Sequence, residues 1–177
     1  MDVRAQLDRY LGQVPDLAAA AFVAPNATVL GAVTLGRDSS VWYGSVLRAD
    51  LNTIEIGEGT NIQDLAMVHL ADDRGVRVGR RCTVGHAAVL HACEVGDECL
   101  VGMSATLLDG VRLGEQCIVG AGALLPPGFE APPGSMVLGA PARIVRALSL
   151  EERAGIRRWA LKYLEVARAH ASRAKPA

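Results

Sequence analysis

A six-residue repeat of aliphatic residues runs through most of this chain and constrains its fold more than any other feature. Four runs carry the repeat: Val23, Val29, Leu35, Val41 and Leu47; Ile56, Ile62 and Val68; Val78, Val84 and Leu90; and Val95, Val101, Leu107, Leu113, Val119 and Leu125. Glycine follows many of these residues directly, and glycine tolerates the tight backbone of a corner. Such self-similarity is typical of a parallel β-helix, in which short strands stack on their counterparts in neighbouring coils. We therefore expect a mainly β fold.

Three cysteines give an internal check on this frame. Cys82, Cys99 and Cys117 each lie four places after the first aliphatic residue of a hexad, 17 and 18 residues apart. If three hexads make one coil, they form a single inward column, with Thr60 in the coil beneath. Small buried side chains that fill a corner are a better interpretation than catalytic or redox thiols.

The regions outside the repeat predict two helices. Ser149 and Glu152 form a capping-box pattern at the start of a C-terminal helix over 149–172. The stripe expected to pack along the outside of the β-helix contains Ile156, Trp159, Tyr163, Val166 and His170. A shorter helix over 3–11 is expected to cover the first coil. The prediction is one domain over 1–177, with the β-helix at about 15–140.

Composition excludes several classes of function. The chain has 177 residues and a net charge of −1. Half of its residues are hydrophobic, but only seven are aromatic. We expect no nucleic-acid partner and no membrane partner, because there is no basic field and no apolar run of about 20 residues. The N-terminal segment lacks the apolar core of a secretory signal, and four cysteines are too few for a disulfide framework. The expected compartment is the cytoplasm.

Three of the four histidines fall in register with the repeat. His69 follows Val68 by one place and His91 follows Leu90 by one place, so both occupy the same outward slot on successive coils. Their separation of 22 residues equals one 18-residue coil plus four, which places an insertion in the corner at 70–75. Imidazoles stacked about 5 Å apart can chelate one ion.

The third histidine, His86, follows Val84 by two places and points away from the other two within its own chain. It can still complete their site if three prisms pack side by side, which predicts a homotrimer with a metal at each interface. Zinc with three imidazoles and an open fourth position is the catalytic arrangement. The alternative is that each histidine is an ordinary surface residue. The polar residues near these histidines argue against that alternative, because the rest of the prism is aliphatic. They are Arg48, Asp50, Asn61, Gln63 and Asp64.

These residues also resemble a known family. The segments that carry the resemblance are Val46-Leu47-Arg48-Ala49-Asp50, Asn61-Ile62-Gln63-Asp64 with His69, Val84-Gly85-His86, Leu90-His91-Ala92-Cys93, 139–146 and the C-terminal helix. Together they are similar to the γ-class carbonic anhydrases over roughly residues 20–170. The resemblance implies a left-handed β-helix, against the usual right-handed crossover, and a trimer with zinc, or iron or cobalt, between subunits.

The resemblance also implies a role for each matching residue. His69 and His91 match the ligands from one chain, and His86 matches the ligand from its neighbour. Gln63 and Asn61 match residues that orient the metal-bound water. Arg48, Asp50 and Asp64 match an ion-pair cluster that ties subunits together beside the substrate, and Tyr163 matches a helix tyrosine near the metal.

The implied activity is that of a lyase, a carbonate dehydratase in which a metal-bound hydroxide attacks carbon dioxide to give bicarbonate. Two departures from the family pattern predict a slow turnover. Leu51 follows Asp50 where the most active members carry a glutamate, and the acidic loop that supplies their proton shuttle is reduced to 70–75.

Other functions remain open at this point. The same hexapeptide repeat is the scaffold of many acyltransferases, so an acyl-CoA-handling enzyme without metal is one alternative. A thioesterase that uses the same metal is another, and a non-catalytic metal-binding trimer is the third.

Overall fold

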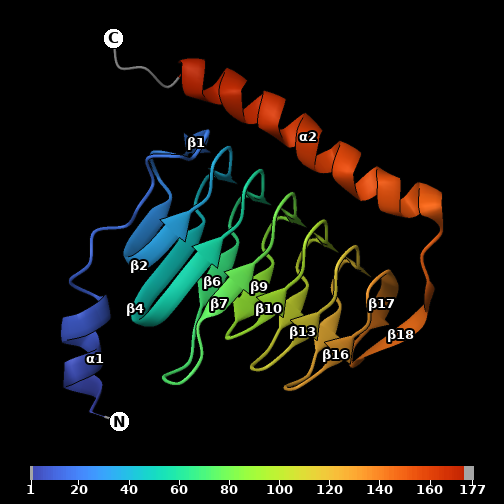
Figure 1. The fold of residues 1–177 in the computed structure, drawn as a ribbon, viewed down its shortest axis with the longest axis horizontal. Coiled ribbons are helices and arrows are strands. Elements are labelled where there is room, and N and C mark those ends of the chain that lie inside the picture. The colour runs from blue at the N-terminus through green and yellow to red at the C-terminus, as the bar shows by residue number, and fades with distance from the viewer. Residues whose placement is uncertain (1, 174–177) are drawn as a thin grey trace.

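The computed structural model describes residues 2–173, which form a stack of short parallel strands with one helix at each end of the chain (Figure 1). The coils make about six turns of a β-helix with three sides. The prediction of a hexapeptide β-helix with a C-terminal helix alongside is confirmed. Side A contains β1 (Phe22–Val23), β3 (Ser40–Val41), β5 (Asn61–Ile62), β8 (Thr83–Val84), β11 (Leu100–Val101), β14 (Ile118–Val119) and β17 (Ser135–Gly139).

The other two sides share two long strands. Side B contains the first halves of β2 (Thr28–Leu35) and β4 (Val46–Ile56), followed by β6 (Met67–His69), β9 (Val89–His91), β12 (Thr106–Leu107) and β15 (Leu124–Leu125). Side C contains the second halves of β2 and β4, followed by β7 (Val76–Val78), β10 (Glu94–Val95), β13 (Arg112–Leu113) and β16 (Glu130–Ala131). An antiparallel strand, β18 (Ala142–Ala147), closes the last coil on β17.

The long strands β2 and β4 bend around one corner of the prism, where the six-residue spacing breaks. Their pairing shifts register between Gly31 and Val33. Gly31 has φ of +77° and a Cβ there would collide with the carbonyl oxygen of Ala49, so the close approach of the two strands requires glycine.

The interior is built from the repeat residues. From Leu35 to Leu125 every aliphatic residue of the repeat is at most 4% exposed, whereas Val23 and Val29 in the first coil are partly buried. Cys82, Cys99 and Cys117 are fully buried free thiols, as the inward column predicts. The backbone N–H of Cys99 donates to Sγ of Cys82, and that of Cys117 donates to Sγ of Cys99, both at 3.4 Å. The cysteines are therefore core residues, and the sulfur atoms of Cys82 and Cys99 also accept a backbone hydrogen bond from the next coil.

The N-terminal helix, α1 (Val3–Tyr10), packs against β4 at the first coils. Its Gln6 side chain donates to the carbonyl oxygens of Leu51 (3.2 Å) and Asp72 (2.8 Å). Residues 70–75 form the predicted insertion, a turn closed by a bridge between Ala71 and Arg74.

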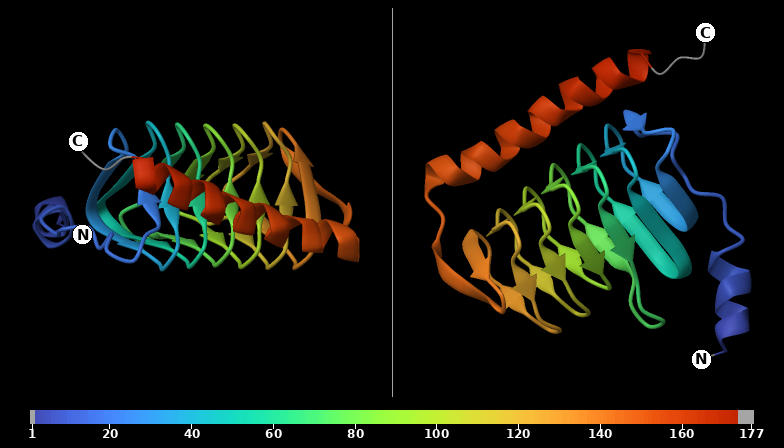
Figure 2. Two further views of the ribbon diagram at one scale, coloured as in Figure 1. Left: turned by 90° about the horizontal axis from the view of Figure 1, so that it is seen from above. Right: turned by 180° about the vertical axis from the view of Figure 1, so that it is seen from behind.

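The C-terminal helix, α2 (Leu150–Arg173), runs back along side A from the last coil to the first (Figure 2). The capping box forms as predicted: the Ser149 N–H donates to Glu152 Oε2 at 2.8 Å, and the Glu152 N–H donates to Ser149 Oγ at 3.2 Å. The predicted stripe is wrong in part. Ile156, Ala160 and Ala167 are buried, whereas Trp159 is 49% exposed because it lies at the edge of the contact.

Within residues 2–173, neither helix offers an apolar stretch of the length that a membrane crossing requires.

Candidate metal centre

His69 and His91 lie directly opposite each other on side B, at the ends of β6 and β9. Their ring centroids are 5.2 Å apart, and Nδ1 of His69 is 3.2 Å from Nε2 of His91. Both side chains point outward and are partly exposed. The predicted stacking of these two imidazoles on successive coils is therefore present.

A carboxylate holds each of these rings at its other nitrogen. Nε2 of His69 is 3.2 Å from Oδ1 of Asp50, and Nδ1 of His91 is 2.5 Å from Oδ1 of Asp109. Burial, together with the charges of Arg48 and His91, lowers the pKa of His69 although Asp50 raises it, and this favours the neutral imidazole. Carboxylates in this position orient metal-ligating histidines and increase their basicity.

The two facing nitrogens fit a shared cation. A neutral imidazole carries one N–H, and in each ring that hydrogen is best placed on the nitrogen beside the carboxylate. In these tautomers Nδ1 of His69 and Nε2 of His91, which are 3.2 Å apart, both act as acceptors. Two nitrogens bound to one tetrahedral zinc at about 2.0–2.1 Å lie about 3.3 Å apart. These two nitrogens are therefore spaced as two ligands of one tetrahedral metal ion would be.

Arg48 completes what we call the His69–His91 cluster: Arg48, Asp50, His69, His91 and Asp109. The Arg48 guanidinium is in contact with Oδ2 of Asp50, whose side chain is only 13% exposed. Although burial raises the pKa of Asp50, its hydrogen bonds to Arg48 and His69 outweigh that effect, and the net pKa is lowered. Asp50 is therefore a stable anion between a guanidinium and an imidazole.

His86 lies apart from this cluster, in the turn after β8 at the corner between sides A and B. Its Nδ1 is 2.8 Å from Oδ2 of Asp64, so it too is held at one nitrogen by a carboxylate. Within one chain Arg48 pairs with Asp50, whereas Asp64 pairs with His86. The ion-pair cluster of all three residues was expected between subunits, and it stays a prediction.

Asn61 and Gln63 lie beside His86 on side A and are almost fully buried. The Gln63 amide donates to Oδ1 of Asn61 at 3.1 Å, and the Asn61 amide donates to the Cys82 carbonyl (3.1 Å) and Thr83 Oγ1 (3.0 Å). This chain of hydrogen bonds fixes the orientation of both amides. Tyr163 reaches the same hollow from α2 as Gln63 and His86.

These residues make up what we call the His86 cluster: Asn61, Gln63, Asp64, His86 and Tyr163. Among residues 2–173 of one chain, no three His, Cys, Asp or Glu side chains are arranged to hold a metal ion together. Cys93 does not join either cluster, because it is fully buried and burial raises the pKa of its thiol to about 12. The fourth histidine, His170, is used structurally, with Nδ1 2.9 Å from the Tyr43 hydroxyl.

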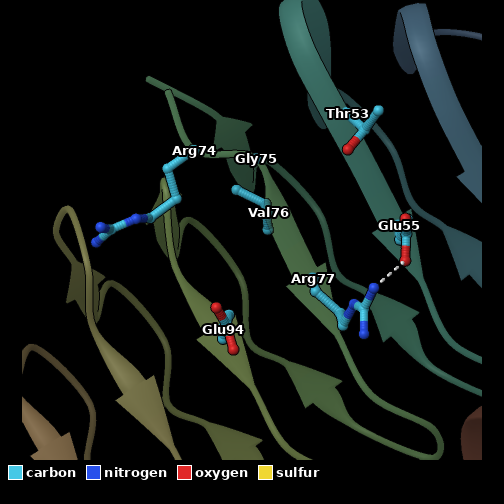
Figure 3. A pocket seen from close by; sticks show the side chains of 7 residues that line it. All are labelled: Thr53, Glu55, Arg74, Gly75, Val76, Arg77 and Glu94. Atoms are coloured by element: carbon cyan, nitrogen blue, oxygen red, sulfur yellow. Dashed lines mark ion pairs between the residues drawn. The ribbon is translucent and has the colours of Figure 1, made fainter. Parts of the chain in front are cut away.

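A separate hollow of about 300 Å³ lies on side C and the 70–75 turn (Figure 3). Arg77 forms an ion pair of 3.2 Å with Glu55 on one neighbouring strand, and Glu94 lies on the neighbouring strand at its other side. None of the predicted site residues lines it. Its charges continue along side C in alternation and are mostly exposed, which is typical of a solvated surface.

Asp109 is the one member of the two clusters that the sequence reading missed. It follows His91 by 18 residues, the length of one coil, so the coil period could have identified it. It was hidden because it lies two places after Leu107 rather than one.

Comparison with known proteins identifies the family to which the chain belongs. The family model described as "Hexapeptide repeat of succinyl-transferase" matches residues 94–125, which covers the coil architecture. A protein of Methanocaldococcus jannaschii named "Probable carbonic anhydrase" is 46% identical over 144 residues, which cover 81% of this chain and 91% of that protein. "Gamma carbonic anhydrase 3, mitochondrial" of Arabidopsis thaliana is 44% identical over 181 residues, which cover 96% of this chain and 70% of that protein. The chain belongs to the γ-carbonic anhydrase family.

Other members of the γ-carbonic anhydrase family are as similar. "Gamma carbonic anhydrase 1, mitochondrial" of Arabidopsis thaliana is 46% identical over 163 residues, or 88% of this chain. This chain spans 59% of the length of that plant protein. Among solved structures, a hexapeptide transferase family protein from Anaplasma phagocytophilum superimposes with a TM-score of 0.82 at 38% identity, covering 86% of this chain and 89% of that one.

Proposed function

We propose that this chain is a metal-dependent γ-carbonic anhydrase that hydrates carbon dioxide to bicarbonate at sites shared between the subunits of a homotrimer. The observation that carries the proposal is the division of three carboxylate-anchored imidazoles into two clusters on one chain. His69 and His91 present two nitrogens to a common point, and His86 presents its ring from another corner of the prism. A neighbouring copy that brings its His86 to the His69–His91 cluster completes a three-nitrogen set.

Zinc is the metal that this donor set suits best, with iron or cobalt as alternatives, and it supplies a water molecule whose pKa is lowered toward neutrality. The chain's own residues then position the reactants. The Gln63 amide would orient this water, and Asn61, whose amide is bound to Cys82 and Thr83, would hold Gln63 in position. Tyr163 closes the site from the helix side.

The ion pairs have a different role in the proposal. Arg48 neutralises Asp50 and so keeps the carboxylate that orients His69 in place. Asp64 orients His86 as Asp50 orients His69. When the two clusters of neighbouring subunits meet, Arg48 of one copy approaches Asp64 of the next, which adds a favourable charge pair to the interface.

The proposal includes a slow turnover. Leu51 occupies the place where a glutamate would help to move the proton. Asp72 and Asp73 are the acidic residues of the 70–75 turn and the candidates to carry the proton in its place. It also places the protein in a reducing compartment, the cytoplasm, because four free thiols include three stacked in one column.

The test is the metal content of freshly purified protein, by mass spectrometry, together with stopped-flow carbon dioxide hydration. We expect one metal per chain and hydration that chelation removes and zinc restores. Metal-loaded protein without hydration would reduce the proposal to a non-catalytic metal-binding trimer. Protein that binds no metal and transfers acyl groups would replace it with an acyltransferase.

A further inference from the structure

Three cysteine sulfurs form a column inside the corner between sides C and A. Cys82, Cys99 and Cys117 directly precede β8, β11 and β14, and these strands pair in register. The three side chains therefore occupy equivalent positions in consecutive coils, and all are fully buried. None of them belongs to the His69–His91 cluster or to the His86 cluster, so the column is separate from the proposed zinc site.

The hydrogen bonds of the column do not by themselves require sulfur. Sγ of Cys82 donates to the Gly96 carbonyl at 3.1 Å and accepts the Cys99 N–H at 3.4 Å. In the coil beneath, the Thr60 hydroxyl makes the same two kinds of bond. It donates to the Gly79 carbonyl at 2.6 Å and accepts the Cys82 N–H at 2.9 Å. Besides its small apolar surface, what sulfur adds to such a column is affinity for soft metal ions.

Cys99 and Cys117 share a hydrogen bond between their sulfurs. This bond lowers the pKa of Cys117 to about 7, although burial opposes the effect. The backbone N–H groups of Ser135 and Gly134 lower that pKa further. The pKa of Cys99 is raised well above its usual value, first by the bond to Cys117 and then by the bond to Cys82. Near neutral pH the pair therefore holds one proton and one negative charge between two sulfurs.

We infer that Cys99 and Cys117 form a two-coordinate site for monovalent copper, Cu(I), in which the ion replaces the proton between the two sulfurs. Stacked positions of adjacent strands lie about 4.7–4.9 Å apart. Two metal–thiolate bonds in line, each about 2.3 Å long as in zinc sites, span about 4.6 Å. Because one monovalent cation replaces another, the buried charge of the pair does not change.

The donor set favours Cu(I) over zinc. Thiolates are soft ligands that select Cu(I), whereas structural zinc takes four ligands in a tetrahedron. Among residues 2–173, no third His, Cys, Asp or Glu side chain joins this pair in a metal-binding group. Cys117 lies one coil below the end of the prism, beneath β17, so an ion reaches the pair by local opening of that coil.

The experiment equilibrates the purified protein, without oxygen, with Cu(I) held by a chromophoric chelator, and then measures bound copper and zinc. We expect one Cu(I) per chain and an unchanged zinc content. X-ray absorption at the copper edge should show two sulfur neighbours and no nitrogen neighbour. His69→Ala should keep the same Cu(I) affinity, because this site needs neither the zinc nor carbon dioxide hydration. Its failure and that of the proposed function are therefore separate outcomes.

Serine substitutions test the ligands, since a hydroxyl already fits this column at Thr60. Cys99→Ser and Cys117→Ser should each weaken Cu(I) binding at least about 100-fold, because a direct ligand matters more than an outer contact, whose loss costs roughly 10- to 100-fold. The controls are Cys82→Ser in the same column and Cys93→Ser, which removes a buried thiol outside it. Both should stay near the wild-type Kd, and urea unfolding checks that every variant is folded.

Three results would overturn the inference. Nitrogen neighbours around copper in the wild-type protein would place the ion on imidazoles instead. An affinity that Cys99→Ser and Cys117→Ser leave unchanged, or that Cys82→Ser reduces as much as they do, would remove this pair as the site. Wild-type protein that takes no Cu(I) from the chelator would leave the three thiols as packing residues only.

Discussion

The imidazole of His69 faces that of His91 across two coils, with Nδ1 of the first 3.2 Å from Nε2 of the second and a carboxylate behind each ring. With each ring hydrogen on the nitrogen beside its carboxylate, both facing nitrogens present a lone pair that a shared cation would accept. A six-residue repeat with one four-residue insertion is what brings these rings, 22 residues apart, into register.

Asp109→Asn should weaken metal binding about 10- to 100-fold, because a neutral amide oxygen accepts from His91 Nδ1 more weakly than the carboxylate and no longer increases the basicity of the ring. Competition with a chromophoric chelator measures this Kd. The matched control is Asp73→Asn in the exposed 70–75 turn, which should keep the wild-type value. Equal affinities in the two variants would remove Asp109 from the site.

Arg48→Ala should weaken subunit association roughly tenfold, about 1.4 kcal/mol, because it leaves Asp50 without its guanidinium partner. Analytical ultracentrifugation over a dilution series measures the effect. Arg77→Ala, which breaks the exposed pair with Glu55 on side C, should leave association unchanged. The assignment of Arg48 to an interface fails if both variants dissociate at the same concentration as wild type.

Leu125→Ala should destabilise the protein by about 2–5 kcal/mol, because Leu125 is fully buried and its removal leaves a cavity. Its neighbour in β15, Leu124, points outward and is 38% exposed, so Leu124→Ala should cost less than about 0.5 kcal/mol. Urea unfolding of the two variants provides the comparison. Similar losses in both would contradict the inward register of the repeat.

Docking of α2 should weaken in acid. Glu152 accepts from Arg146 first and from the Ser149 N–H next, and these contacts lower its pKa to about 2. Because the folded pKa lies below the unfolded value, the stabilisation is complete above about pH 4.5 and is lost as pH falls toward 2. Fluorescence of Trp159 between pH 6 and 2 should show this change.

Glu152→Gln is the control for that titration. It removes the titrating group, so the part of the acid transition that belongs to Glu152 should disappear. An unaltered transition in Glu152→Gln would assign the pH dependence to other carboxylates.

The repeat residues were enough to predict the coils, the inward cysteine column and the facing pair of His69 and His91. All three depend on a fixed period, and a period is visible in sequence. The family resemblance, rather than the period, suggested left-handed coiling, which stays a prediction.

Other features depend on contacts that a period does not describe. The histidine slot does not predict Asp109, because Asp109 lies one place off that slot and directly before the turn at Gly110. The hydrophobic pattern predicts that Trp159 packs against the coils, because hydrophobicity alone does not distinguish the centre of a helix face from its edge. The buried positions include Ala160 and Ala167, small residues that allow α2 to approach the coils closely.

Mixing two single mutants tests the shared site most directly. His69→Ala and His86→Ala should each lose metal, because each removes one nitrogen from every site of a homotrimer. Subunits of the two variants, mixed and allowed to reassemble, should regain part of the wild-type metal content, since some interfaces then combine an intact His69–His91 pair with an intact His86. Mixed trimers that hold no more metal than either mutant alone would contradict the account.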